Sequence, residues 1–299
     1  MKGRIIRLLA GFYYVTTGDD VIYECKAKGS FRNDGIKPLV GDFCIIRKVE
    51  ESDSDPDALP VGNIERILER KNELLRPPVA NVDQALVVFA LKAPDPNFML
   101  LDTFLLRLQL QNIPVIIAFN KTDLDEDGSL REQVRERFAH TGYPICFLCV
   151  KQEQGIEELK QLLEHKCTAL AGPSGVGKSS LINKLASQRV METGKISKKT
   201  ARGKHTTRHS ELICAGEDTY LFDTPGFTSL GTQELSKEDI ARGFIEIGKW
   251  EDACRFAGCS HISEPDCGVK KKLAEGLISP MRYESYVKMY QECRERKRY

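Results

Sequence analysis

The sequence predicts a multidomain protein with an N-terminal β-barrel, a central α/β domain and a C-terminal helical domain that binds a metal ion. Short β-like runs fill the first part of the chain, and apolar runs alternate with helical segments from Gln84 onward. Beyond about residue 235, short helical pieces surround a group of cysteine and histidine residues. The expected domains are 1–66, 67–230 and 231–299.

Composition narrows the classes of function. The 299 residues include 44 Lys or Arg and 43 Asp or Glu, so a net charge of +1 provides no overall positive field for nucleic acid. No export signal and no apolar run of about 18 residues is visible, so we expect a cytoplasmic protein without a membrane partner. The ten cysteines are then expected to be thiols or metal ligands. We expect a monomer.

The N-terminal segment has the pattern of a small barrel. Apolar, β-branched and aromatic runs cover Ile5–Val15, Val21–Cys25 and Phe43–Val49, and turn residues separate them. An acidic stretch over residues 50–60 predicts a long solvated loop before another strand at Asn63–Leu68.

The central segment has the pattern of βαβ units. Near-continuous apolar runs, typical of a parallel sheet covered on both faces, are ALVVFA, VIIAFN, CFLCV and CTALAG. Helical segments between them are predicted at Phe98–Gln111, Ser129–His140 and Gly155–His165. Ser129 and Glu132 have the spacing of a capping box.

A phosphate-binding motif follows the last of these apolar runs. It matches G-x-x-x-x-G-K-S and leads into a predicted helix that begins with Ser180; its residues are Gly172, Pro173, Ser174, Gly175, Val176, Gly177, Lys178 and Ser179. Glycines let backbone amides converge on phosphate oxygens, and the helix N-terminus favours the negative charge. Lys178 is expected to contact the β- and γ-phosphates and Ser179 to bind Mg²⁺. The alternative is an accidental glycine-rich turn.

A second motif, Asp223-Thr224-Pro225-Gly226, follows a short apolar run. Asp223 at a strand end can hold Mg²⁺ through water, and the Gly226 amide can contact a γ-phosphate. By itself this motif is equally consistent with a plain turn. Beside a phosphate loop it predicts a nucleotide sensor.

The nucleotide base is indicated by Asn120-Lys121-Thr122-Asp123. A carboxylate at Asp123 can accept hydrogen bonds from guanine N1–H and the exocyclic amine, whereas adenine offers no such pair of donors. Lys121 is expected along the base plane, and Asn120 is expected to brace neighbouring loops. The motif therefore favours GTP over ATP; the alternative is a helix-capping turn.

The motifs occur in an unusual order. In common GTPases the phosphate loop precedes the base motif, but here residues 120–123 precede residues 172–179. The chain therefore resembles a circularly permuted GTPase, which is physically possible when chain termini lie close together.

A metal site is predicted by three cysteines and one histidine, Cys254, Cys259, His261 and Cys267. Three thiolates and an imidazole suit a tetrahedral structural Zn²⁺ rather than a catalytic one. The alternative is a group of reduced buried cysteines. Cys146 and Cys149 also form C-x-x-C, but within an apolar strand pattern that places them on opposite faces, so we interpret both as core residues.

Together, the barrel-like N-terminus, the permuted motifs and the C-x4-C-x-H-x5-C cluster resemble the RsgA family of GTPases that depend on the small ribosomal subunit. The resemblance covers essentially the whole chain. It implies an OB-fold for the barrel, a permuted GTPase domain and a helical zinc domain. It further implies a role late in assembly of the small subunit, binding in the GTP state, and hydrolysis stimulated by the subunit.

Two local departures matter for mechanism. Cys149-Val150-Lys151 replaces the usual Ser-Ala-Lys, so the backbone contact to the base is expected to persist while the side-chain role is open. Phe227 follows Gly226 where Ras-like enzymes place a water-orienting Gln. The resemblance directs attention to His205, whose imidazole can orient water near neutral pH, or merely contact phosphate or solvent. Thr206 or Thr207 is expected to bind Mg²⁺ and the γ-phosphate.

Partner RNA is suggested only by local charge. Residues 195–208 contain six Lys or Arg and no acid, although such runs are often simply solvated. Residues 255–299 carry a net charge of +4 together with Tyr283, Tyr286, Tyr290 and Tyr299, which suggests a basic aromatic face. The barrel segment, with ten basic and eleven acidic residues, gives a weak charge argument.

The leading hypothesis is an enzyme that hydrolyses GTP to GDP with Mg²⁺, and whose residues 194–209 respond to the nucleotide and control binding to the small subunit and its rRNA. A second hypothesis is a GTP-binding RNA assembly module with little or no hydrolysis. A third is a permuted GTPase that acts on another RNA.

Overall fold

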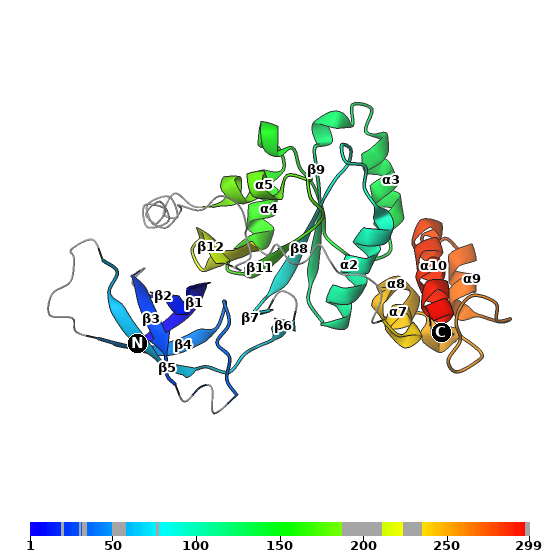
Figure 1. The fold of residues 1–299 in the computed structure, drawn as a ribbon. Coiled ribbons are helices and arrows are strands. Elements are labelled where there is room, and N and C mark those ends of the chain that lie inside the picture. Colours follow the sequence, from blue (N-terminus) through cyan, green and yellow to red (C-terminus); the bar gives the residue numbers. More distant parts are fainter. Residues whose placement is uncertain are drawn as a thin grey trace. The chain divides into compact units, whose positions relative to one another are not determined.

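The computed structural model describes residues 1–18, 21–29, 31, 35–49, 58–75, 78–186, 211–223 and 235–296. A five-stranded barrel, a parallel α/β region and a group of helices with a Cys3His cluster follow one another along the chain (Figure 1), which confirms the predicted fold class. The chain divides into two compact units: Met1–Asp83 with Leu162–Leu170 and Ile182–Phe227, and Gln84–Gln161 with Ala171–Leu181 and Thr228–Tyr299. No helix in the described ranges is long and apolar enough to cross a bilayer.

The barrel occupies the start of the first unit. Its strands are β1 (Lys2–Leu9), β2 (Phe12–Thr17), β3 (Ile22–Ala27), β4 (Phe43–Lys48) and β5 (Val61–Ile67). They pair in the order β1-β2-β3-β5-β4, and an additional pairing of β1 with β4 closes the barrel. Alternate residues point inward, so that Ile5, Val15, Cys25, Ile46 and Ile64 form a buried core.

The run Ile5–Val15 is two strands rather than one. Ala10 and Gly11 both have positive φ, 52° and 87°, and connect β1 to β2 as a two-residue turn. Alanine rarely takes this conformation, so the sequence offered only a weak signal for the turn.

Three more strands of the first unit continue from the barrel. They are β11 (Cys167–Ala171), β12 (Glu211–Gly216) and β13 (Thr219–Asp223). β1 pairs with β12 at Arg7 and Glu211, β12 is antiparallel to β13, and β13 is parallel to β11. A separate two-stranded sheet is formed by β6 (Glu73–Leu75) and β7 (Pro78–Ala80). These pairings place Asp223 at the carboxyl end of a strand, as predicted.

The second unit contains three parallel strands, β8 (Gln84–Ala90), β9 (Val115–Asn120) and β10 (Ile145–Phe147), in the order β10-β9-β8. Every residue of β8 and β9 is buried, as the apolar runs predicted. The connecting helices are α2 (Phe98–Leu110), α3 (Ser129–Phe138) and α4 (Ile156–Leu163), close to their predicted ranges. The capping box is wrong: Gly128 is the N-cap of α3 and makes no side-chain cap.

The Asp125 carboxylate takes over the role of that cap. It accepts hydrogen bonds from the backbone N–H groups of Leu130 and Arg131 at 3.0 and 3.2 Å, and from Arg131 Nε at 2.9 Å. The carboxylate thus satisfies first-turn amides and faces the positive end of the helix.

The C-terminal helices pack onto α2. They are α7 (Lys237–Gly243), α8 (Ile245–Gly248), α9 (Gly268–Ala274) and α10 (Pro280–Arg296). Leu106 of α2 belongs to the same buried cluster as Ile240, Phe244 and Tyr286. A Cβ on Gly243 would lie 2.4 Å from Leu106 Cγ, so only glycine permits this approach of α7 to α2.

A buried group of charges lies within the same contact. The Arg282 guanidinium of α10 donates to Asp102 of α2 at 2.5 Å and to Glu246 of α8 at 2.6 Å. Arg137 of α3 donates to the second Asp102 oxygen at 2.5 Å and to Ser285 Oγ at 2.7 Å. Two cations and two anions therefore compensate one another away from water.

Candidate nucleotide and metal sites

The predicted phosphate loop connects β11 to α5 (Lys178–Leu185). Gly172, Gly175 and Gly177 have φ values of 137°, 80° and 96°, which favour glycine. A Cβ on Gly172 would lie 2.1 Å from the Val88 carbonyl oxygen, and one on Gly177 would lie 2.4 Å from Asn120 Nδ2. The spacing of glycines in the motif is therefore required by local packing as well as by the loop conformation.

The loop and the first turn of the following helix carry a lysine and three exposed serines. Lys178 Nζ donates to the carbonyl oxygens of Gly172 and Pro173 at 2.8 and 2.5 Å, so its charge lies over the loop. Ser174 is exposed, and Ser179 and Ser180 are exposed in the first turn of α5. Val176 is buried and anchors the loop.

The 120–123 segment lies beside this loop. Asn120, at the end of β9, donates from Nδ2 to the Val176 carbonyl at 2.9 Å, and its Oδ1 accepts from Val150 N at 3.2 Å. Lys121 Nζ donates to the carbonyl oxygens of Gly175, at 2.9 Å, and Ala93. The two motifs, separated by about fifty residues and in permuted order, thus meet in one place.

Asp123 follows in a short 3₁₀ turn, η1 (Thr122–Leu124), whose start is fixed by a hydrogen bond from Thr122 N to Leu148 O at 3.1 Å. The Asp123 side chain is exposed, as a residue that reads a base must be. Its Oδ1 accepts from Cys149 Sγ at 3.3 Å. Our interpretation of Cys149 as a core residue is therefore incomplete: it is buried, but it lies beyond β10 and contacts the predicted base site.

Other predicted residues lie outside the described ranges. His205, Thr206 and Thr207, the whole 194–209 segment, and Thr224–Gly226 with Phe227 belong to this group. Of Asp223, the structure gives the backbone at the end of β13.

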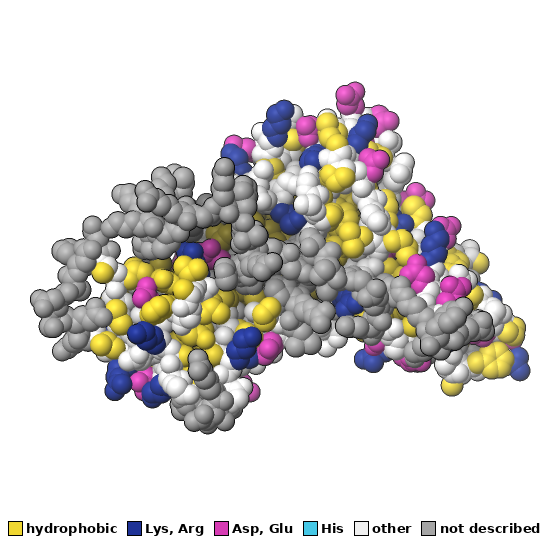
Figure 2. Space-filling view, in the orientation of Figure 1, with side chains coloured by type: hydrophobic (Ala, Val, Ile, Leu, Met, Phe, Trp, Pro, Cys, Tyr) yellow, Lys and Arg dark blue, Asp and Glu magenta, His cyan; other side chains and the backbone are white. Residues whose placement is uncertain are grey.

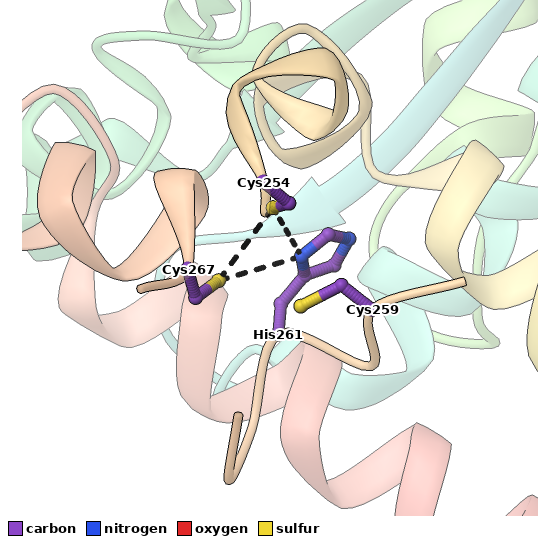
Figure 3. A group of neighbouring side chains, drawn as sticks. All are labelled: Cys254, Cys259, His261 and Cys267. Carbon is purple, nitrogen blue, oxygen red and sulfur yellow. Dashed lines mark hydrogen bonds between the residues drawn. The ribbon is translucent and has the colours of Figure 1, made fainter. Parts of the chain in front are cut away.

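The four predicted metal ligands converge (Figure 3). Their ligand atoms all lie within 4.8 Å of one another. Cys254 Sγ lies 3.4 Å from His261 Nδ1 and 3.8 Å from Cys267 Sγ, and Cys267 Sγ lies 3.6 Å from the same nitrogen. Tetrahedral zinc, with Zn–S of about 2.3 Å and Zn–N of about 2.0 Å, places such atoms about 3.8 Å (S–S) and about 3.5 Å (S–N) apart. The donor set therefore fits a tetrahedral ion bound through Nδ1 of His261.

Burial gives a second reason to expect a cation here. Burial raises the pKa of the Cys259 thiol to about 12, so its thiolate needs a positive charge nearby.

Side chains outside the cluster hold the loop that carries these residues. Tyr283 and Tyr286 donate their hydroxyls to the carbonyl oxygens of His261 and Ser260 at 2.6 and 2.8 Å. Glu264 accepts from Ser260 N and Oγ at 2.9 and 2.6 Å.

These tyrosine contacts correct one prediction. Tyr286 is fully buried, and Tyr283 and Tyr290 pack against the same core, so they do not form an exposed aromatic face. Tyr299 lies outside the described residues. Arg282, counted in the local positive charge, is buried and paired. The prediction of an exposed aromatic face for RNA in residues 255–299 is therefore wrong. The positive charge available to RNA there is also smaller than the sequence count, because Arg282 is buried and paired.

Comparison with known proteins agrees with this architecture. The family model for the RsgA GTPase matches residues 67–233, and that for the RsgA N-terminal domain matches residues 2–54. Proteins called small ribosomal subunit biogenesis GTPase RsgA are 49% identical in Agathobacter rectalis, covering 100% of both chains, and 44% identical in Alkaliphilus metalliredigens, covering 100% of this chain and 99% of the relative.

Solved structures are also similar. YloQ, described as a circularly permuted GTPase, matches with a TM-score of 0.77 at 34% identity over 99% of this chain and 95% of its own. YjeQ from Thermotoga maritima matches with a TM-score of 0.80 at 33% identity over 98% of each chain. These matches favour the hydrolase hypothesis over a non-hydrolysing RNA module. The chain belongs to the RsgA family and is a circularly permuted GTPase.

Proposed function

We propose that this GTPase binds the small ribosomal subunit and acts late in its maturation, hydrolysing GTP to GDP and phosphate with stimulation by the subunit. The names of the relatives support the partner. The nucleotide part rests on one observation above all: Asn120 and Lys121 are hydrogen-bonded to the loop that precedes Lys178. A single nucleotide can span base and phosphate sites that adjoin in this way.

We assign the base to Asn120, Lys121, Thr122 and Asp123, and the phosphates to residues 172–180 with Asp223 and Gly226. Lys178 would exchange its carbonyl partners for phosphate oxygens, a stronger charge-assisted contact. The exposed Ser179 and Ser180 in the first turn of α5 suit the same anion.

Magnesium, when bound, would neutralise charge on the phosphates. Ser179, Asp223 and Thr206 or Thr207 are the residues that would hold it; the exposed Ser179 hydroxyl, one residue after Lys178, fits that role. His205 would orient the attacking water, because Phe227 has no group that does so.

The Cys254, Cys259, His261 and Cys267 site would hold structural Zn²⁺. Support comes from the distances among three of its donor atoms, which match a tetrahedral ion, and from the burial of three of the four residues; Cys254 is partly exposed. The ion would fix the loops between α8 and α9.

Contact with rRNA is best supported at the barrel. Its five strands carry seven Lys or Arg and two Asp or Glu. Without the buried Arg4 the remaining six basic and two acidic residues give a net charge of +4, so the acids of this segment are concentrated in the connections. Arg7 lies 5.9 Å from the Tyr14 ring and Lys26 lies 5.4 Å from the Phe12 ring. Figure 2 shows basic and hydrophobic side chains, with acidic ones among them, on the visible face of the barrel. Phosphates and unstacked bases are suited to such a surface.

Phosphate release, measured with and without small subunits, tests the proposal. We expect slow turnover by the isolated monomer, as for other GTPases that need a partner, and a large increase with small but not large ribosomal subunits. His205→Ala should reduce the stimulated rate and spare GTP binding. Equal rates with both subunits, or none with either, would reject the proposed partner. In cells, we expect the protein to be cytoplasmic and to sediment with small subunits only when GTP is bound.

A further inference from the structure

Arg4 is a buried cation at the contact between the barrel and the β12–β13 hairpin. The residue is 8% exposed, and its Cζ lies 4.9 Å from the ring centroid of Phe43 in β4 and 4.9 Å from that of Tyr220 in β13. Its Nη2 donates to the Asn81 carbonyl oxygen at 3.2 Å. Among the residues that the structure describes, no carboxylate pairs with Arg4, so the faces of the two rings compensate its charge.

The same strands connect the barrel to Asp223 through their backbone pairing. β1 pairs with β12 at Arg7 and Glu211, and Glu211 is in turn the register partner of Asp223 at the end of β13. The Arg7 guanidinium lies 3.8 Å from the Glu211 carboxylate. One row of residues therefore runs across the sheet from the barrel to the residue that we assign to Mg²⁺.

A further contact joins the barrel to β13. A Cβ on Gly41 would lie 2.1 Å from the Ala80 carbonyl oxygen and 2.8 Å from Phe222 Cζ, so only glycine fits between them. The Gly41 N–H donates to the Ile5 carbonyl oxygen of β1 at 2.8 Å, which fixes this loop on the barrel. Tyr220 and Phe222 are two residues apart and lie on one face of β13, so the barrel holds that face at two places.

We propose that Arg4 is a positioning residue for GTP hydrolysis, which holds the barrel against β13 so that a partner bound to the barrel shifts Asp223. β12 follows the 194–209 segment in the chain and β13 ends at Asp223, so both strands adjoin segments predicted to respond to the nucleotide. Packed side chains and a hydrogen-bonded sheet can transmit a displacement between such sites. The inference rests on the proposed function, from which it takes the partner of the barrel and the role of Asp223.

Coupling of this kind acts in both directions. If a partner on the barrel changes the affinity of the nucleotide site, the nucleotide must change the affinity of the barrel for its partner by the same factor. A purely structural Arg4 predicts something else: its loss destabilises the fold and leaves any difference between the GDP and GTP states of the barrel intact. The response of the barrel to the nucleotide therefore separates the two roles.

The first test is hydrogen exchange of the full chain, saturated with GDP or with a non-hydrolysable GTP analogue. In the wild type we expect peptides from β1 and β4 to exchange at rates that differ between the two states. Arg4→Met keeps the apolar stem and removes the cation, so the two rates should become equal. Arg4→Lys retains a charge between the rings and should keep part of the difference.

Two more positions make the test independent of how Arg4→Met folds. Tyr220→Leu removes the ring from the other side of the contact and should abolish the difference between the nucleotide states, whereas Tyr220→Phe retains the ring and should keep it. Ile64→Val is the matched control, because it removes a methylene group from the barrel core and leaves the Arg4 contacts in place. It should lower stability and keep the difference.

The second test is phosphate release with saturating small subunits. In Arg4→Met and Tyr220→Leu we expect the ratio of stimulated to unstimulated rate to fall about fivefold or more, the usual size of such coupling. Wild-type β1 and β4 that exchange equally in both nucleotide states, or an unchanged ratio in both variants, would overturn the role of Arg4. If Arg4→Met abolishes the nucleotide response of the barrel but small subunits do not raise the wild-type rate, the proposed partner is rejected and the coupling through Arg4 stands.

Discussion

Asn120 and Val176 are joined by a hydrogen bond of 2.9 Å from the side-chain amide to the backbone carbonyl, which ties the end of β9 to the phosphate loop. The same side chain accepts from Val150 N, so one buried residue connects three segments. Asn120 therefore holds these segments together independently of which base is bound.

Asn120→Ala should therefore weaken binding of any nucleotide and destabilise the fold. The change leaves a buried N–H and a carbonyl without their partners, at about 1–3 kcal/mol for an unsatisfied group. We expect GTP affinity to fall by at least about tenfold and the thermal midpoint to drop, as measured by calorimetry. Gln152→Ala, an exposed change in the adjoining turn, is the control. Wild-type affinity in the alanine variant would show that the loops hold their places without this link.

Arg282→Met tests how much the buried ion pairs between α10, α2 and α8 contribute to stability. Removing one buried cation leaves Asp102 and Glu246 without their shared partner, and broken buried pairs typically cost about 3–5 kcal/mol. We expect a loss of this size in urea unfolding. Arg255→Met, which removes an exposed ion pair to Asp266, should cost less than about 1 kcal/mol. Similar losses in the two variants would mean that the buried charges add nothing beyond a surface pair.

Metal removal should loosen the C-terminal helices. A strong chelator, or Cys254→Ser, is expected to lower the bound zinc from about one per chain and to lower the thermal midpoint, because thiolate ligands and metal are linked to folding. Cys214→Ser, which changes a cysteine outside the cluster, should retain the metal. Elemental analysis and calorimetry measure both effects. A chain that contains no metal yet melts like the wild type would exclude a structural ion.

Features that one segment encodes by itself were predictable from the sequence. The phosphate loop and the 120–123 segment were predictable because glycine spacing and residue type encode their backbone conformation and chemistry. The convergence of Cys254, Cys259, His261 and Cys267 was predictable for the same reason, since cysteine and histidine at short spacing have few other uses.

Other features depended on contacts that one segment cannot encode. The bond from Cys149 to Asp123 needs a third segment brought alongside, so the C-x-x-C pattern gave no signal for it. Asp125 outcompeted Ser129 as the helix cap because it reaches two backbone amides and Arg131 together. Tyr286 was wrongly predicted to be exposed. The apolar residues of α10 do not form a clear stripe along one face, and the residues that bury Tyr286 lie far away in the sequence.

Asp125 also predicts how stability depends on pH. Burial works to raise the pKa of its carboxyl, but the hydrogen bonds from Leu130 and Arg131 outweigh burial and hold the pKa below its usual value. With an unfolded pKa of about 3.9, the unfolded chain binds the proton more readily. The stabilisation is therefore complete well above that pH and is lost as pH falls through the lower, folded pKa. Urea unfolding between about pH 6 and 2.5 should show the difference between wild type and Asp125→Asn shrinking with acid. Glu126→Gln, an exposed change one residue away, should follow the wild type throughout; a constant gap for Asp125→Asn would show that its charge does not stabilise the start of α3.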